Sequence, residues 1–113
     1  EAAVKSVQTI EVTKAVRSTR FDGLRIKRGQ YIAIVDDEAL IANDDEIEPL
    51  LLRALEKTVC KNVEVITLYY GADTRASQAE EMVQQIRLKY PQAQVELVRG
   101  GQPHYNYIIS LEG

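Results

Sequence analysis

Two side chains of this 113-residue chain, Cys60 and His104, have the chemistry of a nucleophile, a base or a metal ligand, and each is the single residue of its type. A reactive thiolate needs a base, a cation or a helix N-terminus nearby, and a metal ion needs several ligands at suitable spacing. The sequence supplies neither: Cys60 follows Val59 near the end of an expected helix, and His104 precedes Tyr105 in a glycine-rich segment. We therefore expect a buried structural cysteine, a histidine in a turn or at a strand edge, no catalytic residue and no metal site.

Carboxylates are concentrated between residues 36 and 48, and hard cations such as Ca²⁺ bind clustered oxygens. The run lacks the ligand periodicity and central glycine of an EF-hand loop. Turn formation at Asp36-Asp37 and helix capping by residues 44–48 account for these acids without a metal. The acidic residues are Asp36, Asp37, Glu38, Asp44, Asp45, Glu46 and Glu48.

Two glycine-bearing segments follow strands that we expect to be parallel, Tyr70-Gly71-Ala72-Asp73 and Arg99-Gly100-Gly101-Gln102. Ligands of open α/β sheets bind at the carboxyl ends of such strands, and the first segment also leads into a helix whose N-terminus favours anions. Neither segment matches GxGxxG or GxxxxGK[ST]. The alternative is structural: the two glycines adopt positive backbone angles in a turn, and Gln102-Pro103 directs the chain into the last strand.

Tyrosines flank both loops, and those of the last strand alternate with other side chains. Alternation places Tyr105, Tyr107 and Ile109 on one face, with Asn106, Ile108 and Ser110 on the other. Such tyrosines pack a sheet face or anchor a protein partner. The candidate residues for ligand or partner binding are therefore Gly71, Asp73, Arg99, Gly100, Gly101, Gln102, Tyr105 and Tyr107.

The elements that position these residues begin with a β-rich third. Alternating β-formers predict a strand over 7–17, with one irregularity, and strands over 31–35 and 39–42. Residues 21–26 predict a turn at Asp22-Gly23 followed by a short strand. A helix follows, with Pro49 as its first residue and with Leu51 or Leu52, Leu55 and Val59 as its buried stripe.

The second half predicts one β-α-β unit. The apolar run 63–70 is typical of an interior strand, and a second helix is expected after a cap at Asp73 or Thr74. Pro91 ends that helix, whose buried face comprises Ala79, Met82, Val83, Ile86 and Tyr90. A parallel strand over 94–99 follows, and the terminal strand returns antiparallel through the turn 100–103. The sequence thus predicts an α/β (α+β) fold, with a mixed sheet and two main helices packed on it, in one domain over 1–113.

Composition excludes several functions. The net charge of -3 and pI near 5.2 argue against nucleic-acid binding, and no window approaches the length of a membrane span. Charge is nonetheless uneven, because the acidic run follows a basic stretch that contains only Asp22 as an acid. Two solvated faces are the simplest interpretation, and a docking surface is the alternative. The basic residues are Lys14, Arg17, Arg20, Arg25, Lys27 and Arg28.

The first residues, Glu1-Ala2-Ala3-Val4-Lys5-Ser6, have the character of the end of a helix. No secretory or transit pattern precedes the expected fold. Of the two explanations, removal of residues by processing or excision from a longer protein, we favour an excised domain.

Several segments resemble the C-terminal domain of the A subunit of bacterial fatty acid kinase and its dihydroxyacetone-kinase-like relatives. The most specific is GGQP at 100–103, which is followed by an aromatic strand and Ile108-Ile109-Ser110. The others are TKAVR at 13–17, FDG at 21–23, residues 29–35 and ITLYYG at 66–71. The resemblance covers essentially the whole chain.

The resemblance implies a non-catalytic C-terminal domain that docks a DegV-like protein carrying a fatty acid. The parent protein would use ATP and Mg²⁺, bound upstream of Glu1, to phosphorylate that fatty acid in the cytoplasm for phospholipid synthesis. This chain itself would then need no cofactor. Two alternatives remain: a small-molecule or phosphate-binding or hydrolytic domain that uses the Gly71 and Gly100 loops, and a structural domain that maintains a dimer.

Overall fold

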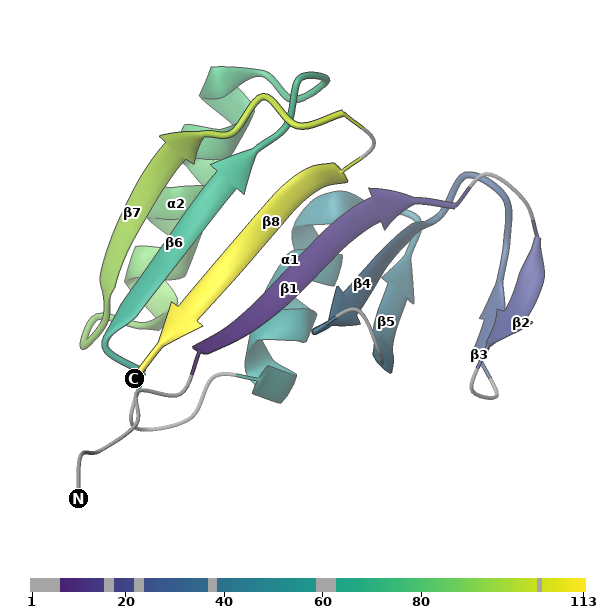
Figure 1. The fold of residues 1–113 in the computed structure, drawn as a ribbon, viewed down its shortest axis with the longest axis horizontal. Helices are drawn as coiled ribbons and strands as arrows, with labels where there is room; N and C mark the ends of the chain where they lie inside the picture. The colour runs from purple at the N-terminus through teal and green to yellow at the C-terminus, as the bar shows by residue number, and fades with distance from the viewer. Residues whose placement is uncertain (1–6, 16–17, 22–23, 37–38, 59–62, 104) are drawn as a thin grey trace.

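A six-stranded mixed sheet carries two helices, and a two-stranded hairpin stands apart from it (Figure 1). The computed structural model describes residues 7–15, 18–21, 24–36, 39–58, 63–103 and 105–113. This arrangement confirms the predicted α+β class. In chain order the elements are β1 (Val7–Lys14), β2 (Thr19–Phe21), β3 (Leu24–Ile26), β4 (Tyr31–Val35), β5 (Ala39–Asp44), α1 (Ile47–Thr58), β6 (Val65–Tyr70), α2 (Ala76–Lys89), β7 (Gln94–Arg99) and β8 (Tyr105–Glu112).

The strand order of the large sheet is β5-β4-β1-β8-β6-β7. Only β6 and β7 are parallel, as the predicted β-α-β unit requires, and β6 is an interior strand. The terminal strand β8 is antiparallel, as expected, but it does not pair with β7. It lies between β6 and β1 and hydrogen-bonds to both, so the end of the chain occupies the middle of the sheet.

Both helices cover the same face of the sheet, behind the strands in Figure 1, with α1 over β4 and β5 and α2 over β6 and β7. Helix α2 buries the predicted stripe, with Tyr90 half-buried at its end. Helix α1 buries Leu51 and Leu55, as predicted, together with Leu50 and Ala54, whereas Val59 lies outside the described residues. The strands contribute to this core Ile10, Val12, Ala33, Ile66, Leu68, Val95, Tyr107, Ile109 and Leu111.

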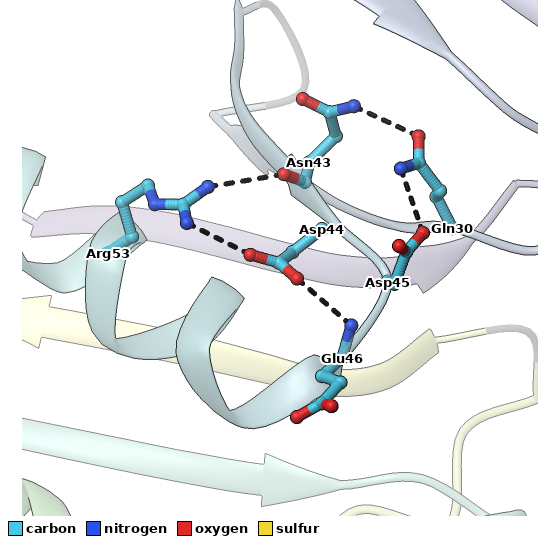
Figure 2. Close-up of polar contacts among 6 residues, drawn as sticks. All are labelled: Gln30, Asn43, Asp44, Asp45, Glu46 and Arg53. Carbon is cyan, nitrogen blue, oxygen red and sulfur yellow. Dashed lines mark hydrogen bonds and ion pairs between the residues drawn. The ribbon is translucent and has the colours of Figure 1, made fainter.

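Helix α1 begins at Ile47, so the prediction that Pro49 is its first residue was wrong. Pro49 is the third residue, which is tolerated because the first four N–H groups of a helix have no intrahelical acceptor. Asp44 stabilises the start of α1: its carboxylate accepts a hydrogen bond from the Glu46 N–H at 3.1 Å and forms an ion pair with Arg53 at 2.9 Å (Figure 2). These contacts, the Glu46 N–H foremost, lower the pKa of the Asp44 carboxyl.

Two further acids of the run, Asp36 and Asp45, hold neighbouring loops through their carboxylates. Asp45 accepts a hydrogen bond from the Gln30 side chain at 3.0 Å (Figure 2), and Asp36, at φ 51°, accepts the Thr9 N–H at 2.9 Å. The predicted roles in turns and at the helix start are confirmed for Asp36 and Asp44, while Asp37 and Glu38 lie outside the described residues.

The prediction that Asp73 or Thr74 caps α2 was wrong. The N-cap residue is Arg75, and no side chain caps the helix. Thr74 is drawn away because its hydroxyl donates to the Asn106 carbonyl at 3.1 Å, which ties the loop before α2 to β8. Strand β1 ends at Lys14, earlier than the predicted residue 17, and its expected irregularity is a register shift between Val12 and Thr13.

Candidate functional site

The loops follow the carboxyl ends of the parallel strands β6 and β7, as predicted, and they meet at the start of β8. The N–H of Gly71 donates to the Asn106 carbonyl at 2.8 Å, and the N–H of Ala72 donates to the Gln102 carbonyl at 3.1 Å. The N–H groups of Gly100 and Gly101 both donate to the Tyr70 carbonyl at 3.0 Å. These amides therefore join the loops to one another, and a ligand would compete with those bonds.

The side chain of Gln102 also holds these loops together. Its Nε2 donates to the carbonyls of Tyr69 and Tyr105 at 3.2 and 3.3 Å, which bridges the end of β6 and the start of β8. Of the two glycines beside it, Gly101 has the predicted positive φ, +67°, but the same prediction for Gly100 was wrong. At Gly100 an added Cβ would instead meet the Gln102 side chain. Residues 100–102 thus join the end of β6 to the start of β8.

Gly71 is needed for a different reason, a close approach between backbones. It is buried, and a Cβ atom there would collide with the carbonyl oxygen of Tyr105. The loop between β6 and α2 can lie against β8 only because this side chain is absent.

A cavity of about 350 Å³ lies beside these loops. Arg99, Gly71 and Gly101 line it, together with Ala76 at the start of α2. Among the described residues of this lining, Arg99 is the one that carries a charge, and the first N–H groups of a helix carry partial positive charge. The cavity therefore has the electrostatics of a site for a small anion, and it contains three of the predicted residues.

Two further predicted residues, Asp73 and Tyr107, line a different cavity, of about 190 Å³, on the helix-covered face of the sheet. Its walls come from the first turn of α1, the middle of α2 and the strands β4 and β8. Glu48 of α1 and Glu81 of α2 also line this cavity. The sequence did not predict this, because the two residues are far apart in the chain and only the packing of both helices brings them to the same cavity. Thr74 lines both cavities, so the loop before α2 separates them.

Tyr107 stands at the boundary between this second cavity and the core. It is 2% exposed, and its predicted alternation with Ile109 on the inner face is confirmed. Burial, and secondarily the negative charge of Glu48, raise the pKa of the Tyr107 hydroxyl to about 12. Burial disfavours the phenolate because the charged form loses its hydration.

The basic stretch of the sequence forms a separate feature, the basic hairpin, defined here as β2, β3 and the following residues Lys27 and Arg28. It projects beside the sheet at the right of Figure 1. Arg20 and Arg25 are exposed and lie directly opposite each other on the two strands. Lys27 and Arg28 are also exposed, and none of these four bases pairs with an acid among the described residues.

The remaining features to consider are metal ligands, membrane-spanning helices and the two residues Cys60 and His104. Among the described residues no group of histidine, cysteine and acidic side chains is arranged to hold a metal ion, and no helix of that part of the chain is long and apolar enough to cross a membrane. Cys60 and His104 lie outside the described residues.

Together, the central strand β8, the two cavities and the basic hairpin define a small α+β domain with candidate binding sites at strand ends and between its helices. The chain belongs to the FakA-like C-terminal family, the C-terminal domains of proteins similar to the A subunit of fatty acid kinase, and the family pattern matches residues 1–112. Among the similar proteins, an uncharacterised protein of Staphylococcus haemolyticus is 33% identical and one of Staphylococcus aureus is 29% identical, each over 97% of this chain. The chain spans 20% of the length of these relatives.

Proposed function

We propose that this chain is the non-catalytic C-terminal domain of a fatty-acid-kinase-like protein and that it docks a DegV-like protein carrying a fatty acid. The parent would then phosphorylate that fatty acid in the cytoplasm, with ATP and Mg²⁺ bound in another part of the longer protein. Family membership and the small share of the relatives that the chain covers support this division of labour.

The observation that carries the docking function is the basic hairpin. Like charges directly opposite each other on a hairpin are destabilising, and Arg20 and Arg25, which are both exposed, hold that arrangement. A projecting hairpin whose four bases pair with no acid among the described residues attracts an acidic surface over roughly a Debye length, about 8 Å at physiological salt. We therefore propose that the docked partner presents acidic groups to this hairpin.

Binding of the protein to its cognate DegV-like partner tests this function. The double variant Arg20→Glu with Arg25→Glu should weaken binding about tenfold or more and reduce its dependence on salt, because charge complementarity steers association. The matched control, Arg75→Glu with Arg87→Glu, makes the same charge change at two exposed residues outside the hairpin and should leave the affinity nearly unchanged. No association of the unmodified protein at high micromolar concentration would refute the docking function.

The second candidate function is binding of phosphate or an acyl phosphate in the cavity beside the glycine loops. Arg99 and the start of α2 favour it. Titration with inorganic phosphate and with acetyl phosphate, read by NMR shifts of the Ala76 and Gly101 amides, tests it. Saturable shifts that disappear in Arg99→Gln would support this candidate, whereas equal shifts in that variant would exclude it.

A further inference from the structure

The cavity between the two helices carries negative charge without a described counter-charge in its walls. Glu48, Asp73 and Glu81 line it from three different elements, and no lysine or arginine does. None of the three carboxylates forms an ion pair or a side-chain hydrogen bond with another described residue. Glu48 and Asp73 lie near helix starts, where acids are stabilised by the dipole, but Glu81 lies well inside α2 and has no such role.

The Tyr107 hydroxyl provides an independent indication of a ligand. The residue is 2% exposed, lines the cavity and has no hydrogen-bond partner for its side chain among the described residues. Every fully enclosed side-chain nitrogen or oxygen of the described residues does have a partner. The hydroxyl therefore retains a small contact with solvent, and a hydrogen-bond donor of a bound ligand can take the place of water there.

The volume of the cavity and the spacing of its carboxylates limit the kinds of ligand that it can bind. A volume of about 190 Å³ is that of roughly six water molecules and is below the range of drug-sized pockets, about 300–1,000 Å³. The carboxylates surround the cavity without converging on one point, since no metal-holding group of acids exists among the described residues. A spatially extended organic cation meets separated acceptors better than a metal ion does.

The aromatic walls favour one such cation. Tyr31 and Tyr107 both line the cavity, and the Lys14 ammonium already lies 5.7 Å from the centroid of the Tyr31 ring. A guanidinium group stacks on aromatic rings and presents five N–H donors in a plane, whereas an ammonium is a compact and strongly hydrated charge. We propose that this cavity binds a guanidinium group, supplied by an arginine side chain of a protein partner or by a free arginine-like small molecule.

The proposal is independent of docking through the basic hairpin and is tested on the protein alone. The probe is N-acetylarginine amide, and its neutral counterpart N-acetylcitrulline amide has nearly the same shape. In ¹⁵N NMR titrations the arginine probe should cause saturable shifts at Thr74, Gln78 and Asn106, while the citrulline probe should bind at least about tenfold more weakly.

Variants distinguish binding of the probe in the cavity from general attraction between its charge and the acidic surface. Glu81→Gln and Tyr107→Phe should each weaken binding about three- to tenfold, because each removes one partner of the cation. The control is Glu80→Gln, which removes the neighbouring exposed carboxylate of α2 that does not line the cavity and should have no effect. ¹⁵N spectra of the variants show whether each remains folded.

Several results would overturn the proposal: no saturation with the arginine probe, equal binding of both probes, or equal effects of Glu80→Gln and Glu81→Gln. Free arginine distinguishes the two sources of the guanidinium group. Tighter binding of the capped probe supports a protein side chain, because its amide groups reproduce those that flank an arginine within a chain. Tighter binding of free arginine supports a small molecule, whose α-ammonium and carboxylate then add to the recognition.

Discussion

The Tyr107 hydroxyl shows how position within the fold changes the chemistry of one side chain. Its pKa rises from 10.0 to about 12 because burial disfavours the phenolate and Glu48 adds a like charge. The folded protein keeps a proton that the unfolded chain loses between these two pKa values, so the unfolded state binds fewer protons and stability falls as pH rises through this window. Below pH 10 this contribution is fully present.

The corresponding prediction compares the protein with Tyr107→Phe in urea unfolding as pH increases. The original protein should lose roughly 1–3 kcal/mol of unfolding free energy between about pH 10 and pH 12 beyond any loss in the variant. Absorbance of the phenolate in the near ultraviolet should show one tyrosine fewer titrating at the high end in Tyr107→Phe. Parallel pH dependences of the two proteins would contradict a raised pKa at this residue.

Individual residues near the strand ends were predicted unevenly from the sequence. The positive φ of Gly101 follows from the preference of glycine for turns, and the inward position of Tyr107 follows from alternation. The role of Thr74 could not be predicted, because its acceptor, the Asn106 carbonyl, lies 32 residues away in sequence. Glu48 and Glu81 were missed for the same reason, since only the packing of two helices on one sheet face brings them to one cavity.

At the scale of elements, the loop between β6 and α2 is fixed by its contact with β8. The Gly71 and Ala72 amides and the Thr74 hydroxyl all donate to carbonyls at or just before that strand. The loop therefore depends on a close approach of its backbone to β8.

Two glycine variants test this dependence. Gly71→Ala should destabilise the protein by about 3 kcal/mol, because the added methyl group meets the Tyr105 backbone, which cannot move without disturbing β8. The control Gly101→Ala has open space around it and should lose only about 1 kcal/mol, the cost of a positive φ in a residue with a Cβ. Urea unfolding measures both, and a loss in Gly71→Ala no larger than in the control would refute the close approach.

The elements themselves were largely predictable, because hydrophobic periodicity reports which face is buried. The strand 63–70 and the buried stripe of α2 are confirmed, and the hairpin of β4 and β5 lies where the acidic turn indicated. Helix starts were less predictable. Proline is favoured early in a helix but does not mark its first residue, and α1 begins two residues earlier, after the contacts of Asp44.

For the molecule as a whole, the decisive feature is the central position of β8. The N-terminal strands β1, β4 and β5 and the C-terminal unit of β6, α2 and β7 meet only through this strand within the described sheet. Local patterns predicted an antiparallel terminal strand but could not predict its neighbours, because strand order depends on contacts that are distant in sequence. The pairing of β8 with both halves implies that they unfold as one unit.

The side chain of Ile109 allows the coupled unfolding of the two halves to be tested. It is fully buried in β8, opposite Ile10 of β1 on one side and Leu68 of β6 on the other. Ile109→Ala should cost about 3 kcal/mol through lost burial and a residual cavity, whereas the control Ile108→Ala, at a half-buried neighbour on the other face, should cost about 1 kcal/mol. Native-state hydrogen exchange should then show an equal loss of protection for the slowest amides of β1 and of β6 in Ile109→Ala. A loss confined to one of these two strands would mean that the halves unfold separately and that β8 does not couple them.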